Sequence, residues 1–267
     1  MAVSTIAGPA GTLHVDDGGK GRPPVVLLHA FSGNADHWTA QLTHQRKKRR
    51  AIAFDFRGHG RSEMPTIEEL TVDRMADDVA SVVNKLGLYD FVLVGHSIGG
   101  SVAIDYAAGH PDRVAGLVVI GAPGKVPDAQ AKQILDSMKA DYDKVTEAYW
   151  LKLLAHAMPK TRERIMKEMR MLPKDAGFAL IAATFAFDPV PGMILYPGPK
   201  LAIVTGDKEQ PHDLHRTVPD LPFRRIAGTS HWPHLDQPAM VNAILDAFIA
   251  SQVHLHVEMP WRRRAAE

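Results

Sequence analysis

The chain has 267 residues, and none of them is cysteine. Without thiols it cannot carry disulfides, thiolate zinc sites, Cys-held iron–sulfur clusters or a cysteine nucleophile. Excess charge is lacking as well, because 31 Lys and Arg residues face 30 Asp and Glu residues and leave a net charge of +1. Such a balance offers no general surface for a polyanion, so nucleic acid is not an expected partner.

Long apolar runs are also missing. The runs at residues 25–28 and 117–120 fall far short of the roughly 18 residues that cross a bilayer. Residues 1–15 have neither the basic leader nor the continuous apolar stretch of a secretory signal. We therefore expect a cytoplasmic protein with no membrane partner.

Two basic clusters stand out, at residues 46–50 and 262–264. Either could be a patch for anions or nucleic acid. Neither is interleaved with aromatic residues that could stack bases. We interpret them as a solvated loop and a frayed chain end.

Short β-branched runs alternate with longer helix-like stretches along most of the chain. This alternation is typical of an α/β fold with a mostly parallel central sheet flanked by helices. Apolar residues at helical spacing predict helices at 72–86 and 240–249. The predicted strands are residues 25–29, 51–55, 91–95, 117–120, 201–205 and 223–226.

The alternation stops between residues 124 and 199. Apolar residues there recur at helical spacing, Met is frequent, and prolines punctuate the stretch. We predict an inserted helical cap at 124–199, and a core domain made of residues 1–123 and 200–267. The cap's Met residues either fill gaps between its helices or form an adaptable wall facing a substrate.

The strongest local motif is Gly95-His96-Ser97-Ile98-Gly99-Gly100, which lies between the predicted strand at 91–95 and a helix-like stretch at 101–108. A Ser at the apex of a strand-to-helix turn needs small neighbours, and its hydroxyl stands exposed above the sheet. The N–H groups that begin the helix favour negative charge at the same place. Ser97 is therefore the candidate nucleophile.

A serine nucleophile needs a histidine that removes its proton and a group that orients the histidine. His231 follows the predicted strand at 223–226 and precedes the final helix, so it lies at the same sheet edge as Ser97. His231 is the candidate base and His234 is its rival. With a reference pKa near 6.5, such a base predicts activity that rises between about pH 6 and 8.

These motifs, taken in order, resemble those of the α/β-hydrolase superfamily, in the branch with a helical cap. His29-Ala30-Phe31 resembles the oxyanion loop, residues 55–62 resemble a D-x-R-G-x-G-x-S segment, and residues 228–233 resemble the loop of the catalytic His. The resemblance spans about residues 12–250. It implies the fold and a nucleophile–His–acid site.

The resemblance also assigns the remaining site residues. The acid is expected three positions after Gly206, where Glu209 stands in place of the usual Asp, and Asp207 is the alternative. The oxyanion hole would consist of the backbone N–H groups of Phe31 and Ile98. His29 is expected to be a packed or hydrogen-bonded loop residue.

Together these expectations describe a serine hydrolase of the carboxylesterase type that cleaves a small to medium, moderately apolar ester and uses no cofactor. Trp232 is the expected substrate contact, and no metal site is expected, since His254 and His256 lack a suitable carboxylate partner. A lactonase, a carbon–carbon bond hydrolase and a cofactor-free perhydrolase would use the same triad. A non-catalytic ligand receptor is the alternative from another class. Oligomeric state is not predicted.

Overall fold

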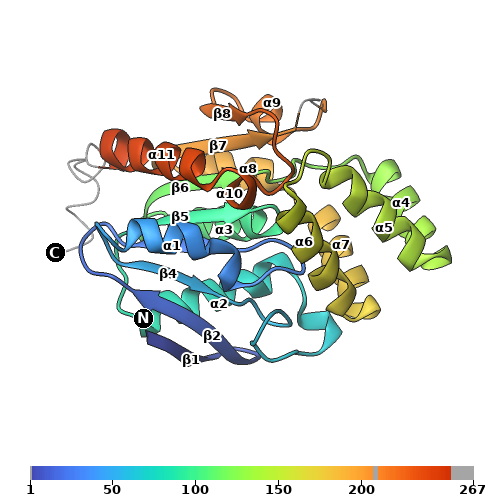
Figure 1. The fold of residues 1–267 in the computed structure, drawn as a ribbon, viewed down its shortest axis with the longest axis horizontal. Helices are drawn as coiled ribbons and strands as arrows, with labels where there is room; N and C mark the ends of the chain where they lie inside the picture. Colours follow the sequence, from blue (N-terminus) through green and yellow to red (C-terminus); the bar gives the residue numbers. More distant parts are fainter. Residues whose placement is uncertain (1, 207–209, 254–267) are drawn as a thin grey trace.

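The computed structural model describes residues 2–206 and 210–253. The described part contains one eight-stranded sheet in the order β1-β2-β4-β3-β5-β6-β7-β8 (Figure 1). From β4 to β8 all neighbours are parallel, whereas β2 runs antiparallel to both β1 and β4. The strands are β1 (Ala2–Gly8), β2 (Gly11–Gly18), β3 (Val25–Leu28), β4 (Ala51–Phe54), β5 (Phe91–His96), β6 (Val114–Ile120), β7 (Lys200–Thr205) and β8 (Phe223–Ile226).

Helices cover both faces of the sheet. One face carries α2 (Val72–Lys85), α3 (Ile98–Gly109) and α8 (Pro189–Leu195), and the other carries α1 (Thr39–Gln45) and α11 (Pro238–Phe248) (Figure 1). The remaining short elements are η1 (Ala35–Trp38), η2 (Ile67–Glu69), α9 (Leu214–Thr217), α10 (Pro233–Asp236) and the π-helical η3 (Ile249–Val253).

Alternate residues of the central strands feed the two apolar layers. In β3, Val26 and Leu28 pack in the layer under α2 and α3, whereas Val25 and Leu27 pack in the layer under α1 and α11. This follows from the two-residue period of a strand, and it explains why these strands are apolar at every position. The sheet therefore holds its carboxyl edge rigidly, and that edge carries the candidate site.

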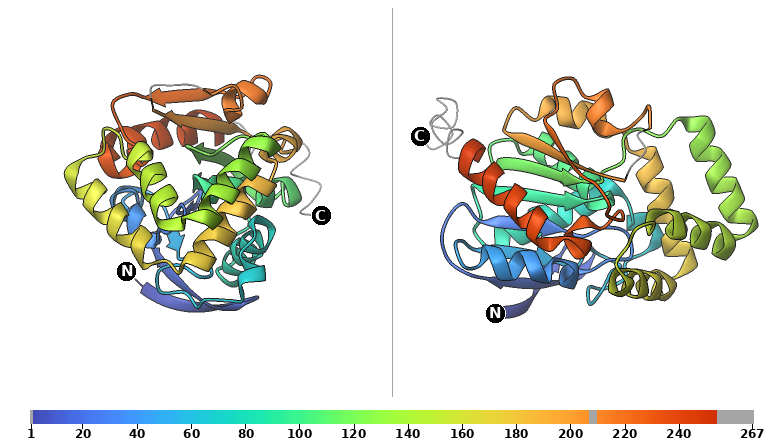
Figure 2. Two further views of the ribbon diagram at one scale, coloured as in Figure 1. Left: turned by 90° about the vertical axis from the view of Figure 1, so that its right-hand side faces the viewer. Right: turned by 45° about the horizontal axis from the view of Figure 1, so that its top comes forward.

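Four helices between β6 and β7 form the cap, by which we mean α4 (Asp128–Ala140), α5 (Tyr142–Leu153), α6 (Pro159–Met171) and α7 (Lys174–Ala186). They gather at the carboxyl end of the parallel strands (Figures 1 and 2). The helix that follows them, α8, packs on α3 instead. Because α8 packs on the core, the helices that form the cap end before residue 199. The division of the chain into two domains stays a prediction.

Within the described residues, no single helix is long and apolar enough to cross a membrane. Only α7 and α8 taken together, with a bend of 57° between them, reach the length and composition of a span.

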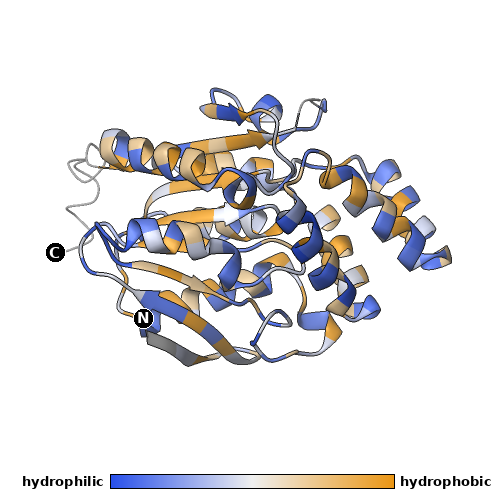
Figure 3. Ribbon diagram, viewed as in Figure 1, coloured by the Kyte–Doolittle hydropathy of each residue, from blue (hydrophilic) through white to orange (hydrophobic). Residues whose placement is uncertain are grey.

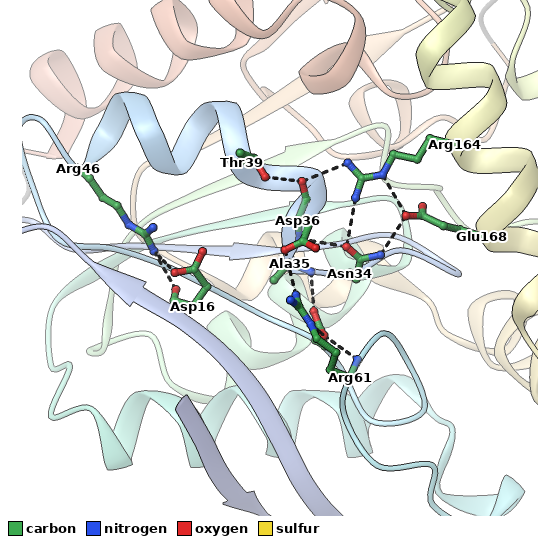
Figure 4. Close-up of polar contacts among 10 residues, drawn as sticks. Asp16, Asn34, Ala35, Asp36, Thr39, Arg46, Arg61, Arg164 and Glu168 are labelled. Carbon is green, nitrogen blue, oxygen red and sulfur yellow. Dashed lines mark hydrogen bonds and ion pairs between the residues drawn. The ribbon is translucent and has the colours of Figure 1, made fainter. Parts of the chain in front are cut away.

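The predicted parallel strands and both predicted helices are confirmed. The hairpin of β1 and β2 was missed, because its residues are only partly apolar and its turn, Gly8-Pro9-Ala10-Gly11, was not recognised as joining two strands. The interpretation of residues 46–50 as a solvated loop is wrong in part. Arg46 pairs with Asp16, as Figure 4 shows, Arg50 pairs with Asp17, and Lys48 pairs with Asp246, so three of the five cations are matched by carboxylates.

Candidate active site

Ser97 lies at the turn between β5 and α3 with φ 54° and ψ −121°. A non-glycine residue rarely adopts positive φ, and such strain collects at functional sites. The turn is held from below, because the Ser97 N–H donates to the carbonyl of Ile120 at 2.9 Å. The side chain is only partly covered. Ser97 therefore has the backbone geometry that presents a hydroxyl above the sheet.

The glycines on either side of Ser97 are required by close packing. A Cβ on Gly95 would collide with the carbonyl of Gly99, and a Cβ on Gly99 would collide with the carbonyl of His29. The start of α3 thus abuts the end of β3, where the loop to η1 begins. The small residues of the sequence motif are explained by these contacts rather than by turn conformation alone, since neither Gly95 nor Gly99 has positive φ.

His231 lies in the loop between β8 and α10, and its ring faces the ends of β6 and β7. A Cβ placed on Gly121 would be 3.1 Å from His231 Nδ1 and 3.4 Å from the hydroxyl of Thr205. Gly121 follows Ile120, the residue that accepts from Ser97. The structure therefore brings the candidate nucleophile and the candidate base to the same edge of the sheet.

Burial lowers the pKa of His231 to about 4. A neutral imidazole is the form that can accept a proton from a serine. The expectation that activity rises between about pH 6 and 8 used the reference pKa, so burial moves the expected rise to lower pH.

His96 connects the serine turn to the histidine loop. Its Nε2–H donates to the backbone carbonyl of His231 at 2.8 Å. Its ring centroid lies 4.8 Å from that of His231 and 4.6 Å from that of His234. Burial, followed by the proximity of His234 and His231, lowers the pKa of His96 well below its usual value.

His234, the rival base, is fully buried and stacks on Trp38 at 4.3 Å. Among the described residues, neither of its ring nitrogens has a hydrogen-bond partner. Burial and neighbouring positive groups lower its pKa well below the usual value. His234 has no exposed surface, and its ring packs between those of Trp38 and His96, so it is a core residue.

The loop between β3 and η1 turns sharply at residues 30–33. The Gly33 N–H closes the turn on the carbonyl of Ala30 at 3.0 Å, and Ser32, its third residue, has φ 53°. A type II turn requires positive φ at that position. Phe31 therefore lies at the second position of the turn, and Ala30 keeps an ordinary φ.

The backbone N–H groups of Phe31 and Ile98 donate to no protein acceptor among the described residues. Ile98 is the first residue of α3, where an N–H has no partner within the helix. The loop of Phe31 and the start of α3 lie side by side, because Gly99 packs against the carbonyl of His29. Both N–H groups can therefore serve a bound oxyanion.

His29 is buried and hydrogen-bonded, as expected. Its Nε2 accepts from the Phe56 N–H at 3.0 Å, so the proton is on Nδ1, which donates to the Ala30 carbonyl at 2.7 Å. Asp55 supports the same loop by accepting from the Ala35 N–H at 2.6 Å. These hydrogen bonds hold the loop that carries Phe31.

Three aromatic rings meet above the site. Trp150 of α5 lies 5.1 Å from Phe31 and 5.7 Å from Trp232, measured between ring centroids. Trp232 is fully buried, and its ring is perpendicular to that of His231 at 5.2 Å. The cap therefore adds the indole of Trp150 to Phe31 and Trp232, the two aromatic residues next to the candidate catalytic groups.

A groove of about 420 Å³ runs between α4 and α7, away from these rings. Phe185 lies in its wall, while the ring of Phe178 is covered by the ammonium group of Lys139 at 5.8 Å.

The candidate acids Asp207 and Glu209 lie outside the described residues, as do His254 and His256. Within residues 2–206 and 210–253, no three His, Asp or Glu side chains converge as metal ligands.

Comparison with known proteins agrees with the fold. A model of the alpha/beta hydrolase family matches residues 25–244, so the chain belongs to this family. RutD of Caulobacter vibrioides, named as a candidate carbamate hydrolase, is 31% identical over 206 residues, which is 70% of this chain and 73% of RutD. The sn-1-specific diacylglycerol lipase ABHD11 of Mus musculus is 28% identical over 264 residues, with 88% and 83% of the two chains covered.

Among solved structures, a thermophilic esterase from Thermogutta terrifontis superimposes with a TM-score of 0.79 at 26% identity. The match covers 95% of this chain and 100% of the esterase.

Sequence reasoning missed two contacts of the site. Trp150 reaches the site from the cap, and no motif marks it among the helical residues of that region. His96 was recognised only as part of the serine motif, although its position next to Ser97 at a strand end could have suggested a contact with another loop.

Proposed function

We propose that the protein is a serine hydrolase that cleaves a carboxylic ester through an acyl-enzyme. The observation that carries this proposal is the Ser97 turn, with positive φ, at the start of a helix whose first N–H is unpaired. A receptor on the same fold would have no need to maintain that strain. The hydrolases among the relatives support the reaction class.

In this mechanism His231 takes the proton of Ser97 while the serine oxygen attacks the ester carbonyl. The N–H groups of Phe31 and Ile98 stabilise the oxyanion of the tetrahedral intermediate. The proton passes to the leaving alcohol, the acyl-enzyme forms, and water activated by His231 releases the acid. Glu209, or alternatively Asp207, would orient the imidazole and stabilise its charged form.

The substrate is proposed to be neutral and moderately apolar, because the apolar rings of Phe31, Trp150 and Trp232 pack together beside the candidate site. Lactones, carbamates and carbon–carbon substrates fit the same acyl chemistry, and perhydrolysis differs only in the acceptor. A cytoplasmic location and the absence of nucleic-acid and membrane partners stay predictions from the sequence.

The test compares wild type with Ser97→Ala on p-nitrophenyl esters of increasing acyl length, alongside lactones, a carbamate and an aryl diketone. We expect turnover of the preferred ester to fall by about 10⁴-fold or more, and a fluorophosphonate probe to label wild type at Ser97 alone. Ser101→Ala is the matched control, since Ser101 lies one turn along α3 and its buried hydroxyl has no partner in the described chain. Activity or labelling that survives in Ser97→Ala would exclude the proposal.

A further inference from the structure

One carboxylate of the cap contacts the oxyanion loop, which we define as residues 29–38. Glu168 of α6 accepts from the Asn34 side-chain amide at 3.1 Å through Oε1. Its other oxygen, Oε2, accepts from His37 Nε2 at 2.6 Å. The Glu168 side chain is 17% exposed and that of His37 is 1% exposed. A single side chain of the cap therefore binds two residues of the loop.

Arg164, one helical turn before Glu168, reinforces this contact. Its Nε donates to Glu168 Oε1 at 3.0 Å, and its terminal nitrogens donate to the Asn34 side-chain oxygen and the Asp36 carbonyl, both at 3.3 Å (Figure 4). Burial alone would raise the pKa of Glu168, but the hydrogen bonds and charges of His37 and Arg164 lower it to about 2. The carboxylate is therefore ionised and acts only as an acceptor.

The two residues that Glu168 binds lie directly beside the turn that carries Phe31. A Cβ on Gly33, the last residue of the turn, would be 3.0 Å from the His37 ring, so the ring packs against the turn. Asn34 follows Gly33 and starts η1 by accepting from the Asp36 N–H at 3.0 Å. His37 and Asn34, which contact the cap, are therefore also the direct neighbours of Gly33 in the turn.

The core supports the same loop from the opposite side. Asp55 accepts from the Ala35 N–H, and Arg61 donates to the Asp36 carboxylate at 2.9 Å (Figure 4). Ser32 within the turn has unfavourable positive φ, so the loop needs external contacts to keep its shape. The cap supplies those on one side.

We propose that Glu168 is a positioning residue, which holds the Phe31 N–H in the oxyanion hole through His37 and Asn34. This inference rests on the proposed acyl-transfer function. An oxyanion donor acts mainly in the transition state, where its loss reduces turnover by about 10²- to 10³-fold, and small misplacement of a catalytic group already costs up to about 10²-fold. Glu168 thereby makes the placement of the cap a requirement for turnover.

Glu168→Gln tests the proposal. The glutamine keeps the shape and one acceptor, but its NH₂ group cannot accept from His37. We expect kcat for the preferred p-nitrophenyl ester to fall about 10- to 100-fold, with KM within about threefold of wild type. Affinity for an alkyl boronic acid, whose tetrahedral adduct on Ser97 places an oxygen in the hole, should fall by a similar factor.

Glu147→Gln is the matched control. Glu147 forms a 3.0 Å ion pair with Arg170 within the cap, and both side chains are at least half exposed. It should leave kcat within twofold of wild type. His37→Asn removes the other partner of the contact, and the double variant with Glu168→Gln should lose no more activity than the more impaired single variant, because both act through one contact.

The outcomes separate this inference from the function itself. If wild type hydrolyses esters and Glu168→Gln matches Glu147→Gln in kcat, the positioning role is wrong. An increase in KM alone, or additive losses in the double variant, would also overturn it. If wild type neither hydrolyses any ester nor reacts with the fluorophosphonate, the proposed function itself fails.

Discussion

The sheet and the cap are stabilised in different ways. Every residue of β3, β4, β5 and β6 is buried, whereas α4 buries only Ala131 and Met138. Hydropathy follows the same division, with β5 and β6 mainly hydrophobic and α6 mainly hydrophilic (Figure 3). Apolar burial and fixed backbone contacts therefore position the serine turn. The cap buries fewer apolar residues, among them Trp150, Ile165 and Leu180, and adds directed polar contacts to the core.

The polar contacts of the cap reach the loops that carry the candidate catalytic residues. The carbonyl of Leu153, at the end of α5, accepts from the His231 N–H at 2.9 Å. The Met158 N–H, just before α6, donates to Asp236 at 3.0 Å, and Asp236 also accepts from Ser230 beside His231. Together with Glu168, these contacts attach the cap to both the loop of His231 and the oxyanion loop. The comparison implies that damage to the sheet unfolds the protein, whereas damage to the cap contacts mainly impairs turnover.

The largest effect on stability is expected where α3 packs directly against the end of β3. Gly99→Ala would drive a Cβ into the carbonyl of His29, a backbone atom that cannot move without displacing β3. We expect the free energy of unfolding, measured by urea titration, to fall by roughly 3 kcal/mol or more, with loss of activity.

The matched control for Gly99→Ala is Gly109→Ala at the other end of α3, where a Cβ would meet nothing within 4 Å. Removing a helix glycine there should change stability by less than about 1 kcal/mol. Similar losses at the two positions would show that packing at the elbow is not the cause.

A second test compares ion pairs of the two regions. In the core, Arg57 donates to both oxygens of Asp78, at 2.9 and 2.7 Å, and both side chains are 1% exposed. Asp78→Ala would leave the buried guanidinium with its weaker contact to Glu69 alone, and we expect a loss of about 3–5 kcal/mol in unfolding free energy.

In the cap, Asp143→Ala removes an ion pair with Lys174 whose side chains are 70% and 65% exposed. Exposed pairs contribute about 0–1 kcal/mol. Urea titrations of both variants at the same salt concentration give the comparison, and equal losses would contradict the difference between the regions.

The difference between the buried sheet and the cap also determined what could be predicted from the sequence. Strands buried on both faces appear as continuous apolar runs, and the elbow appears as G-x-S-x-G because its steric demands are local. The hairpin of β1 and β2 carries no such run. The contacts of Trp150, His96 and Glu168 join residues far apart in the chain, and their partners depend on how the cap sits, which no local pattern encodes. The role proposed for Phe31 was suggested only by resemblance to a family.

A third prediction concerns acid stability. Burial lowers the pKa of His29, His59, His96, His231 and His234. Each binds a proton more readily when unfolded, so its contribution is fully present above the unfolded pKa near 6.5 and is lost as pH falls toward the folded pKa. We expect the unfolding free energy to decrease steadily from about pH 6.5 to 4.

His96→Leu and His234→Leu each remove one of these groups, so each should flatten the pH dependence even if it changes the stability at pH 8. A pH dependence identical to that of wild type would mean that the buried histidines are not its source.

The smallest expected effect is the pH dependence of turnover, and it also distinguishes the two candidate acids. With a pKa of 6.5, the neutral fraction of His231 would increase about fourfold between pH 6 and 8. Burial, which lowers the pKa to about 4, predicts a kcat/KM that falls only below pH 6.5.

A carboxylate bonded to the imidazole stabilises the charged ring and raises this pKa, so removing it should shift the fall to still lower pH. Profiles of wild type, Glu209→Gln and Asp207→Asn between pH 4 and 8 measure this shift, and the variant with the lower apparent pKa identifies the acid. A wild-type midpoint at or above 6.5 would show that burial does not control His231, and an unchanged midpoint in both variants would place the orienting group elsewhere.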